Sequence, residues 1–352
     1  MKRRIDSRWI AVTVLVTLLV LAPLYLKRFP YQMTVVTGAF FYAILASSWA
    51  LLAGVGGQFS FAHMAFVGIG AYTAGLIGRD LGTTPLVGII AGTLLAGVVG
   101  LVIGFLCLRL RAAYLSLFTI AFSEIFRIAL LTEFKFTEGS NGLQLGKLWE
   151  GITSMQEYYV MLALLLGAMS LMYWLAGSRF GLFVRSMRED EEAASAMGVN
   201  VVRYKVMIFV ITSLIVGLAG AVFYHQVGII TPNTMEILQM SLVIAMVVIG
   251  GMESLLGAAV GAFLSRVGLE LLREINLFGF HLELGAWRYA AFGVLLVLTL
   301  RFAQNGLLYP IIDLLFMRRA RKETVAKRVQ ATPVLSDALS PLKGEAEGEV
   351  ES

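Results

Sequence analysis

Long apolar runs separated by short polar loops are the feature that most constrains this chain. The runs cover about residues 9–26, 33–53, 62–78, 85–108, 113–131, 158–176, 205–227, 238–250, 255–272 and 286–302. A hydrocarbon core about 30 Å thick requires about 20 apolar residues in each helix that crosses it. Charged residues make up only 14% of the chain, which excludes an ordinary soluble enzyme or a nucleic-acid-binding domain. The sequence therefore predicts an all-α integral membrane protein, a polytopic bundle of about ten transmembrane helices, some short or broken.

Lys and Arg residues are unevenly divided between the predicted loops. If the N-terminus lies inside, the N-terminus and segments 109–111, 179–205 and 318–322 are cytoplasmic and hold about fifteen basic residues, whereas the opposite loops hold about half as many. Cytoplasmic loops of membrane proteins are enriched in these residues. Both termini are therefore predicted to be cytoplasmic.

The loops also divide the chain into parts. We predict a transmembrane domain over residues 1–320, with an outer loop at 132–157 and a charged cytoplasmic loop at 179–204. Residues 321–352 mix Lys, Glu, Pro, Gly and Ser without apolar periodicity. Such a composition predicts a disordered cytoplasmic tail.

The cytoplasmic loop has the strongest local pattern. Arg185 and Arg188 are three residues apart on a predicted helix, and the acidic residues 189–192 open a second short helix, where negative charge is favourable. Gly198 is a predicted helix stop. One interpretation is a solvated linker, and the other is a docking element for a partner. The candidate residues for docking are Arg185, Arg188, Glu191, Glu192, Ala193, Ala194 and Gly198.

Several motifs resemble one known family. The segment from Glu192 to Gly198 matches the EAA-xxx-G signature of ABC importer permeases, whose short helix sits in a cleft of the ATPase subunit. The stretches Gly57–Tyr72, Gly139–Leu143 and Gly250–Gly257 resemble those of branched-chain amino acid permeases of the LivM type. Order and spacing agree from about residue 35 to 305. One departure is Glu138, which stands where that family usually has glycine.

This resemblance implies a non-catalytic permease subunit of an ATP-driven importer for branched-chain or related amino acids, in the bacterial inner membrane. It implies a second homologous permease, two ABC ATPase subunits that use ATP and Mg²⁺, and an extracytoplasmic solute-binding protein. The sequence has no GxxxxGK[ST] phosphate loop, so we expect no ATP hydrolysis and no cofactor in this chain. The single cysteine, Cys107, and three scattered histidines predict no metal site.

Polar residues near the start of the third run are candidates for a translocation pathway. Gln58, Ser60 and His63 lie beside a glycine cluster, which suits a broken helix that exposes polar groups to a solute. They also suit a helix cap or bonds between packed helices, and the sequence leaves both interpretations open. The resemblance adds three residues of the outer loop to the candidate pathway, namely Ser140, Asn141 and Gly142.

Glu124 and Arg127 lie three residues apart in the fifth run, so they share a helix face and can form an intramembrane ion pair. The pair is interpreted either as structural or as a gating or solute contact. A rival function is an ion- or proton-coupled secondary transporter, which requires carboxylates or broken-helix ion sites in the membrane. An intramembrane enzyme would require a convergent nucleophile and base, and the sequence offers none.

Overall fold

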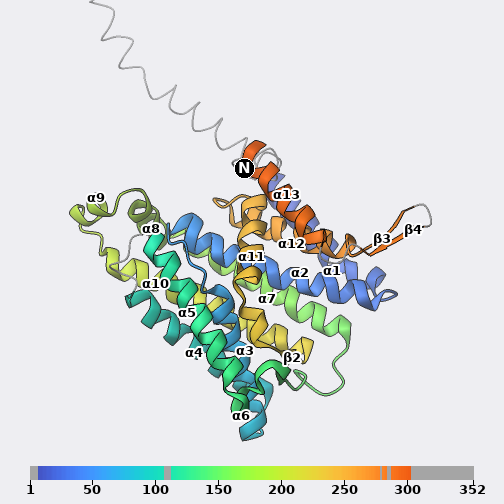
Figure 1. Cartoon of the computed structure of the whole chain (residues 1–352). Coiled ribbons are helices and arrows are strands. Elements are labelled where there is room, and N and C mark those ends of the chain that lie inside the picture. The colour runs from blue at the N-terminus through green and yellow to red at the C-terminus, as the bar shows by residue number, and fades with distance from the viewer. Residues whose placement is uncertain (1–6, 107–111, 278–279, 284–286, 303–352) are drawn as a thin grey trace, which may run out of the picture. The chain divides into compact units, whose positions relative to one another are not determined.

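The computed structural model describes residues 7–106, 112–277, 280–283 and 287–302 (Figure 1). The chain divides into two units, and all contacts discussed below lie within the larger one, Thr17–Tyr309. Of the smaller unit, residues 1–16 and 310–352, only Ser7–Val16 of helix α1 is described. The predicted tail 321–352 and the basic segments 109–111 and 318–322 lie outside the described residues.

Helices dominate the described part of the chain. The helices are α1 (Ser7–Leu26), α2 (Pro30–Trp49), α3 (His63–Leu81), α4 (Pro85–Leu106), α5 (Ala112–Thr132), α6 (Phe134–Thr137), α7 (Ser154–Gly177), α8 (Arg179–Glu189), α9 (Glu191–Ala196), α10 (Val201–Val227), α11 (Ile237–Gly250), α12 (Leu255–Leu271) and α13 (Trp287–Phe302). Short antiparallel strands pair as β1 (Leu143–Gln144) with β2 (Ile229–Ile230), and as β3 (Glu274–Leu277) with β4 (Phe280–Glu283). The all-α architecture predicted from the apolar runs is confirmed.

Each predicted apolar run coincides with one helix, but not every helix is a simple span. By length and hydropathy, five helical segments of the described chain can cross a membrane, and a sixth if α11 and α12 form one broken span. Among the residues whose side chains are described, Val16–Leu26 of α1 and Tyr289–Thr299 of α13 form shorter apolar segments. α3 begins with His63 and carries Arg79 in its last turn. The predicted number of ten is therefore approximate.

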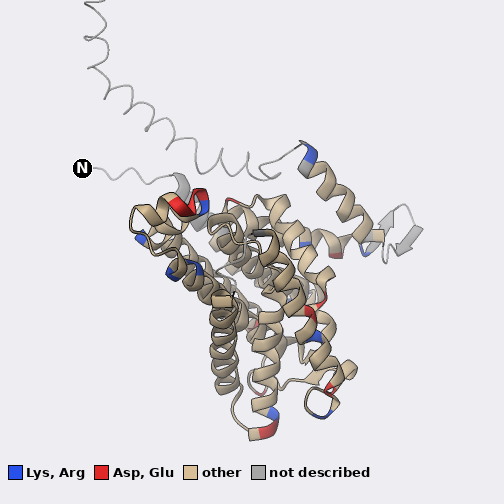
Figure 2. Ribbon diagram, turned by 60° about the vertical axis from the view of Figure 1, so that its left-hand side comes forward, with Lys and Arg blue, Asp and Glu red and all other residues tan. Residues whose placement is uncertain are grey.

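The polar loops gather at two ends of the bundle. At one end Arg188 of α8 forms an ion pair with Glu253, between α11 and α12. At the other end β1 pairs with β2, and Arg79 forms an ion pair with Glu138. Figure 1 shows α9 and α6 at these opposite ends, and Figure 2 shows most charged positions near helix ends and loops. The grouping agrees with the predicted sidedness, while the assignment of one end to the cytoplasm stays a prediction.

Helices α3, α4 and α10 pack at unusually short distances because glycines face each other. A Cβ atom at Gly92 of α4 would lie 2.2 Å from the carbonyl oxygen of Gly70 in α3, and a Cβ at Gly70 would lie 2.2 Å from the carbonyl of Gly217 in α10. Small residues allow helix backbones to approach in this way. Glycines four residues apart, Gly88 and Gly92, both face the α3 backbone in this way.

Helices α11 and α12 are bent by 118° across residues 251–254. A Cβ atom at Gly250 would lie 2.1 Å from the carbonyl oxygen of Gly257, so the two backbones touch beside the bend. Ser254 caps α12 by accepting a hydrogen bond from the Gly257 amide at 3.0 Å. The predicted break between the runs 238–250 and 255–272 is therefore a sharp turn that is held by a cap and close glycine contact.

Helix α2 also ends irregularly. Its last turns continue as a π-helix over Ala50–Val55, in which the Gly56 amide donates to the Leu51 carbonyl at 3.1 Å. Gly57 follows with a φ of +69°, a conformation that glycine adopts without strain. The chain then runs through Gln58–Ala62 into α3. Short π-helical segments are frequent at functional sites.

Candidate functional site

The charged loop forms two short helices, α8 and α9, that are joined at Asp190. The Asp190 carboxylate accepts hydrogen bonds from the amides of Glu192 and Ala193 at 2.9 and 3.0 Å. These amides belong to the first turn of α9 and have no carbonyl partner within a helix. Glu191 and Glu192 add negative charge at the same end, where the helix dipole favours it. The predicted start of a second helix is confirmed, and Asp190 is its cap.

Gly198 ends the α9 segment as predicted. The helix stops at Ala196, the Gly198 amide donates to the Ser195 carbonyl at 2.9 Å, and the Val199 amide donates to the Ala194 carbonyl at 3.0 Å. Gly198 has a φ of +85°, and a Cβ there would meet no atom within 4 Å. Glycine is therefore favoured at this position for its backbone conformation and not for space.

Most of α9 is open to a partner. Ala194 is buried, whereas Glu191, Glu192 and Ala193 are exposed, and Met197 just after the helix is 85% exposed. The exposed side of α9 thus combines carboxylates, a small alanine and a flexible methionine. An exposed apolar side chain next to a helix with small side chains is a surface on which another protein can pack closely.

Two ion pairs fix the loop to the bundle. Lys205 at the start of α10 contacts Glu191 with an N–O distance of 2.5 Å. Arg188 contacts Glu253 at 2.9 Å and also donates to the Gly54 carbonyl of the π-helix. Arg185 is exposed. The two arginines of α8 predicted for docking therefore differ, because Arg188 contacts Gly54 and Glu253 of the bundle, whereas Arg185 is exposed.

The segment Gln58–His63 is closely packed between helices. Gln58, Ser60 and His63 are all buried. The Ser60 carbonyl accepts a bond from the Trp49 indole at 2.8 Å, and the Gln58 amide group donates to the Lys205 carbonyl at 3.4 Å. Within the described residues, neither ring nitrogen of His63 has a hydrogen-bond partner. In this structure the segment serves packing, and its predicted role in translocation stays a prediction.

The outer-loop candidates lie at the other end of α3. Gly139–Asn141 form one 3₁₀ turn, Ser140 and Asn141 are exposed, and Gly142 has a φ of +81°. A Cβ at Gly142 would lie 2.8 Å from the Ile230 carbonyl, so glycine permits the β1–β2 contact. The structure does not bring these three residues together with Gln58, Ser60 and His63, because the 19-residue α3 separates the two groups.

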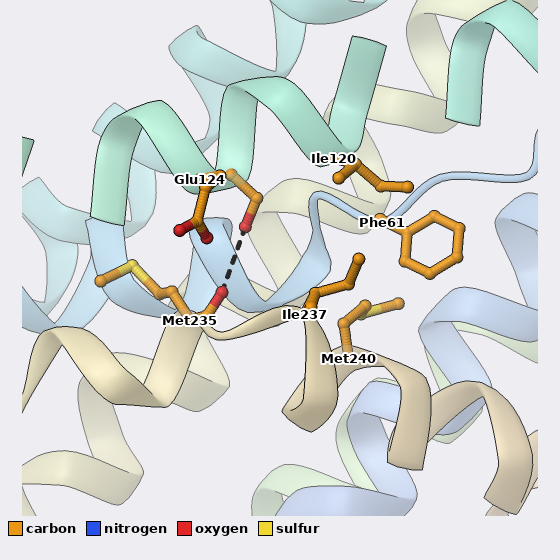
Figure 3. A pocket seen from close by; sticks show the side chains of 7 residues that line it. Phe61, Ile120, Glu124, Met235, Ile237 and Met240 are labelled. Carbon is orange, nitrogen blue, oxygen red and sulfur yellow. Dashed lines mark hydrogen bonds between the residues drawn. The ribbon is translucent and has the colours of Figure 1, made fainter. Parts of the chain in front are cut away.

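Glu124 and Arg127 form the predicted ion pair on α5. Arg127 donates to both carboxylate oxygens of Glu124, from Nε at 3.0 Å and from Nη2 at 2.5 Å. Glu124 also lines a cavity of about 110 Å³, together with Phe61, Ile120, Ser123, Met235, Ile237 and Met240 (Figure 3). The cavity lies between α5, the segment before α3 and the beginning of α11. Sequence reasoning found the pair but not the cavity.

Other contacts in the candidate region were also missed by sequence reasoning. Gly54 and Glu253 contact α8 from distant parts of the sequence, and no local pattern indicates either contact. Lys205 lies shortly after α9, but no motif marks it as the partner of Glu191. Asp190 could have been identified, because an aspartate directly before a helix start is a common cap. In the described part of the chain, no group of three or more His, Cys, Asp or Glu residues is arranged to hold a metal ion.

The fold and the projecting loop define a polytopic α-helical membrane protein with discontinuous helices and a helix presented outside the bundle. The family model described as "Branched-chain amino acid transport system / permease component" matches residues 32–300. The chain therefore belongs to the family of branched-chain amino acid transport system permease components. This membership favours the permease interpretation over the ion-coupled secondary transporter.

Individual relatives agree with the family assignment. The chain is 29% identical to the high-affinity branched-chain amino acid transport system permease protein LivM of Escherichia coli K12, over 84% of this chain and 74% of that protein. It is 26% identical to a probable LivM permease of Methanocaldococcus jannaschii, over 72% of this chain and 81% of that protein. It is 27% identical to LivH of Escherichia coli K12, over 63% of this chain and 79% of that protein. No solved structure matches the chain.

Proposed function

We propose that this chain is the permease subunit of an ATP-driven ABC importer for branched-chain or related amino acids. The observation that carries the proposal is α9, a six-residue helix that is capped at its start by Asp190 and ended by Gly198. It is largely exposed, and the ion pair between Glu191 and Lys205 joins it to α10. A helix presented in this way suits the transfer of movement from a separate protein. The sequence has no phosphate-binding loop of its own.

The partners follow from this role. The complex contains two ATPase subunits, which use ATP and Mg²⁺, and one of them docks on α9 from the cytoplasm. A second homologous permease completes the translocation path. Similarity to both LivM and LivH proteins supports a pair of related permeases. An extracytoplasmic binding protein delivers the solute. The chain then resides in the bacterial inner membrane with both termini in the cytoplasm, in agreement with its distribution of basic residues.

The contacts of Arg188 support a route for coupling. Arg188 joins α8 to the π-helical end of α2 through Gly54 and to the bend between α11 and α12 through Glu253. Both are places where a membrane helix is irregular, and irregular helices line the solute sites of many transporters. Closure of the ATPase subunits moves α9, and Arg188 transmits this movement to the two irregular regions, which opens the path alternately to either side.

Cross-linking tests the docking surface. In a Cys107→Ser background, which contains no other cysteine, Ala193→Cys should be captured by a thiol cross-linker on an ATPase subunit. Ser140→Cys is the matched control, because it is exposed at the opposite end. Capture from Ala193 and not from Ser140 supports the proposal. Purification of the chain in mild detergent without any ATPase, or equal capture from both positions, would refute it.

A further inference from the structure

Helix α5 is the least buried of the five helical segments that can each cross the membrane. Only 17% of the residues in its apolar window are buried, whereas the share in the other four segments of the described chain is 39–83%. Its exposed positions include Leu117, Ala121, Ile125 and Ile128. Because these positions are three or four residues apart, they lie on one helix face. We call this face, together with Glu124, the open face of α5.

The opposite face of α5 is bound within the chain. The Ser116 hydroxyl donates to the Phe59 carbonyl at 3.0 Å, and the Ser123 hydroxyl donates to the Met235 carbonyl at 3.4 Å. These bonds attach α5 to the segment before α3 and to the turn before α11. The described chain therefore fixes one side of this helix and leaves its open face uncovered.

A carboxylate distinguishes the open face from a surface that suits lipid. Glu124 lies near the middle of the span Ala113–Thr132, and its side chain is 41% exposed. Arg127 neutralises the charge through two N–H donors. Ionised side chains within membrane spans nevertheless face protein or a water-filled cavity almost without exception. Lipid is therefore an unfavourable covering for this face.

Helix α4 provides the contrast within the same protein. Its 22 residues, Pro85–Leu106, include no charged side chain. Its exposed positions include Leu94, Val98, Leu101 and Phe105, and such a face suits the lipid hydrocarbon. The two exposed helices therefore differ in chemistry, which indicates that they have different neighbours in the membrane.

The wall of a water-filled path is also a poor description of the open face. Its residues other than Glu124 are apolar, and Arg127 already pairs with that carboxylate. Contacts between membrane helices combine small side chains, which allow close approach, with polar groups that bond across the helices. Ala121 and the Glu124–Arg127 pair are one helical turn apart and supply both features. The composition therefore favours a helix of another protein chain.

A related permease suits this position. The chain is similar both to LivM and to LivH of Escherichia coli K12, and related subunits commonly assemble through the same surface of each partner. We infer that the open face of α5 is the surface on which the second homologous permease packs, with the Glu124–Arg127 pair inside the contact. The inference rests on the proposed function, and it adds the surface through which the two permeases assemble.

Photo-cross-linking identifies the molecule that covers this face. In the assembled complex, Leu117→p-benzoylphenylalanine and Ile128→p-benzoylphenylalanine should capture the second permease. Val98→p-benzoylphenylalanine is the matched control, because Val98 is exposed on the lipid-like face of α4, and it should capture no permease. Equal capture from Val98, capture of a second copy of this chain, or no capture from either α5 position would overturn the inference.

A large side chain tests whether the contact is close. Ala121→Trp should reduce co-purification of the second permease about tenfold, because it forces packed helices apart. Ala121 is exposed, so the change leaves packing within the chain intact. Val98→Trp should leave co-purification unchanged. Co-purification at the wild-type level in Ala121→Trp would overturn the inference.

Thiol labelling tests for a water-filled path. In the Cys107→Ser background, Ile125→Cys in the assembled complex should react far more slowly with a charged methanethiosulfonate than Ser140→Cys, which is exposed in the outer loop. Equal reaction rates would show that water covers the open face and would overturn the inference.

These outcomes are distinct from failure of the proposed function. A second permease that co-purifies with the wild-type chain but is not captured from α5 overturns this inference alone. A wild-type chain that leaves its membrane in mild detergent with neither a second permease nor an ATPase overturns the proposed function, and this inference with it.

Discussion

Arg188 of α8 and Glu253 of the α11–α12 turn form an ion pair with an N–O distance of 2.9 Å, across 65 residues of sequence. The same guanidinium donates to the carbonyl of Gly54. One side chain of the projecting loop therefore contacts two irregular membrane helices. A connection of this kind allows movement of the loop to change helix packing.

We predict that Arg188→Gln uncouples the loop from the bundle. Because Glu253 is 69% exposed, loss of the pair should reduce stability by only about 1 kcal/mol or less. Uptake should nevertheless fall roughly tenfold, within the usual range of coupling between protein sites. ATPase co-purification should be unchanged, and uptake in reconstituted vesicles measures the effect.

Arg185→Gln is the matched control for Arg188. Arg185 is exposed on the same helix, and the contacts with Gly54 and Glu253 belong to Arg188, so loss of Arg185 should weaken ATPase co-purification and leave the contact of α8 with the bundle intact. Full uptake in Arg188→Gln would contradict the proposed coupling route.

We predict a graded effect at Gly198. Gly198 has a φ of +85°, and a Cβ atom built there would have no neighbour within 4 Å. A substitution therefore acts through backbone strain alone. Alanine should destabilise the end of α9 by about 1 kcal/mol, and asparagine by less, because it tolerates this conformation better. Uptake should therefore be highest in the wild-type protein, lower in Gly198→Asn and lowest in Gly198→Ala. Equal uptake by all three proteins would show that the conformation of this turn does not matter for transport.

We predict that Glu138→Gly stabilises the protein. Glu138 is the non-glycine residue of the described chain with a positive φ, +60°, and a left-handed conformation costs a residue with a Cβ about 1–2 kcal/mol. The ion pair with Arg79, at 3.5 Å and partly exposed, contributes less than this. Thermal unfolding in detergent should show a higher midpoint for Glu138→Gly. Glu138→Gln, which removes the ion pair and keeps the strain, should not be stabilised; an equal increase in both would refute the strain argument.

We predict opposite effects for two glycines in neighbouring helices. Gly92→Ala places a Cβ 2.2 Å from the Gly70 carbonyl, so α3 and α4 must separate, at a cost of about 1–3 kcal/mol. Gly78→Ala in α3 meets no atom within 4 Å and should be neutral or stabilising by up to about 1 kcal/mol. Thermal unfolding of the two variants tests this difference. Destabilisation of the same size at both positions would contradict the packing of α3 against α4.

Much of the candidate site could be predicted because its signals are local. Asp190 to Gly198 carry a helix cap, an acidic first turn and a glycine stop within nine residues, and the structure confirms the helix that they indicate. Glu124 and Arg127 are one helical turn apart, so their pairing follows from helix geometry alone. The inward direction of Arg188 could not be predicted, because its partners Gly54 and Glu253 belong to distant segments.

The sequence by itself determined the class of this protein and the positions of its helices, because the length of an apolar run and the positions of caps are properties of consecutive residues. Only the tertiary structure decided which irregular segments meet. The contact of Gly250 with Gly257 beside the bend of α11 and α12, and the cavity between Glu124 and Met240, depend on how separate helices pack. Side-chain volume and close glycine contact set that packing in three dimensions, and no periodicity along the chain records it.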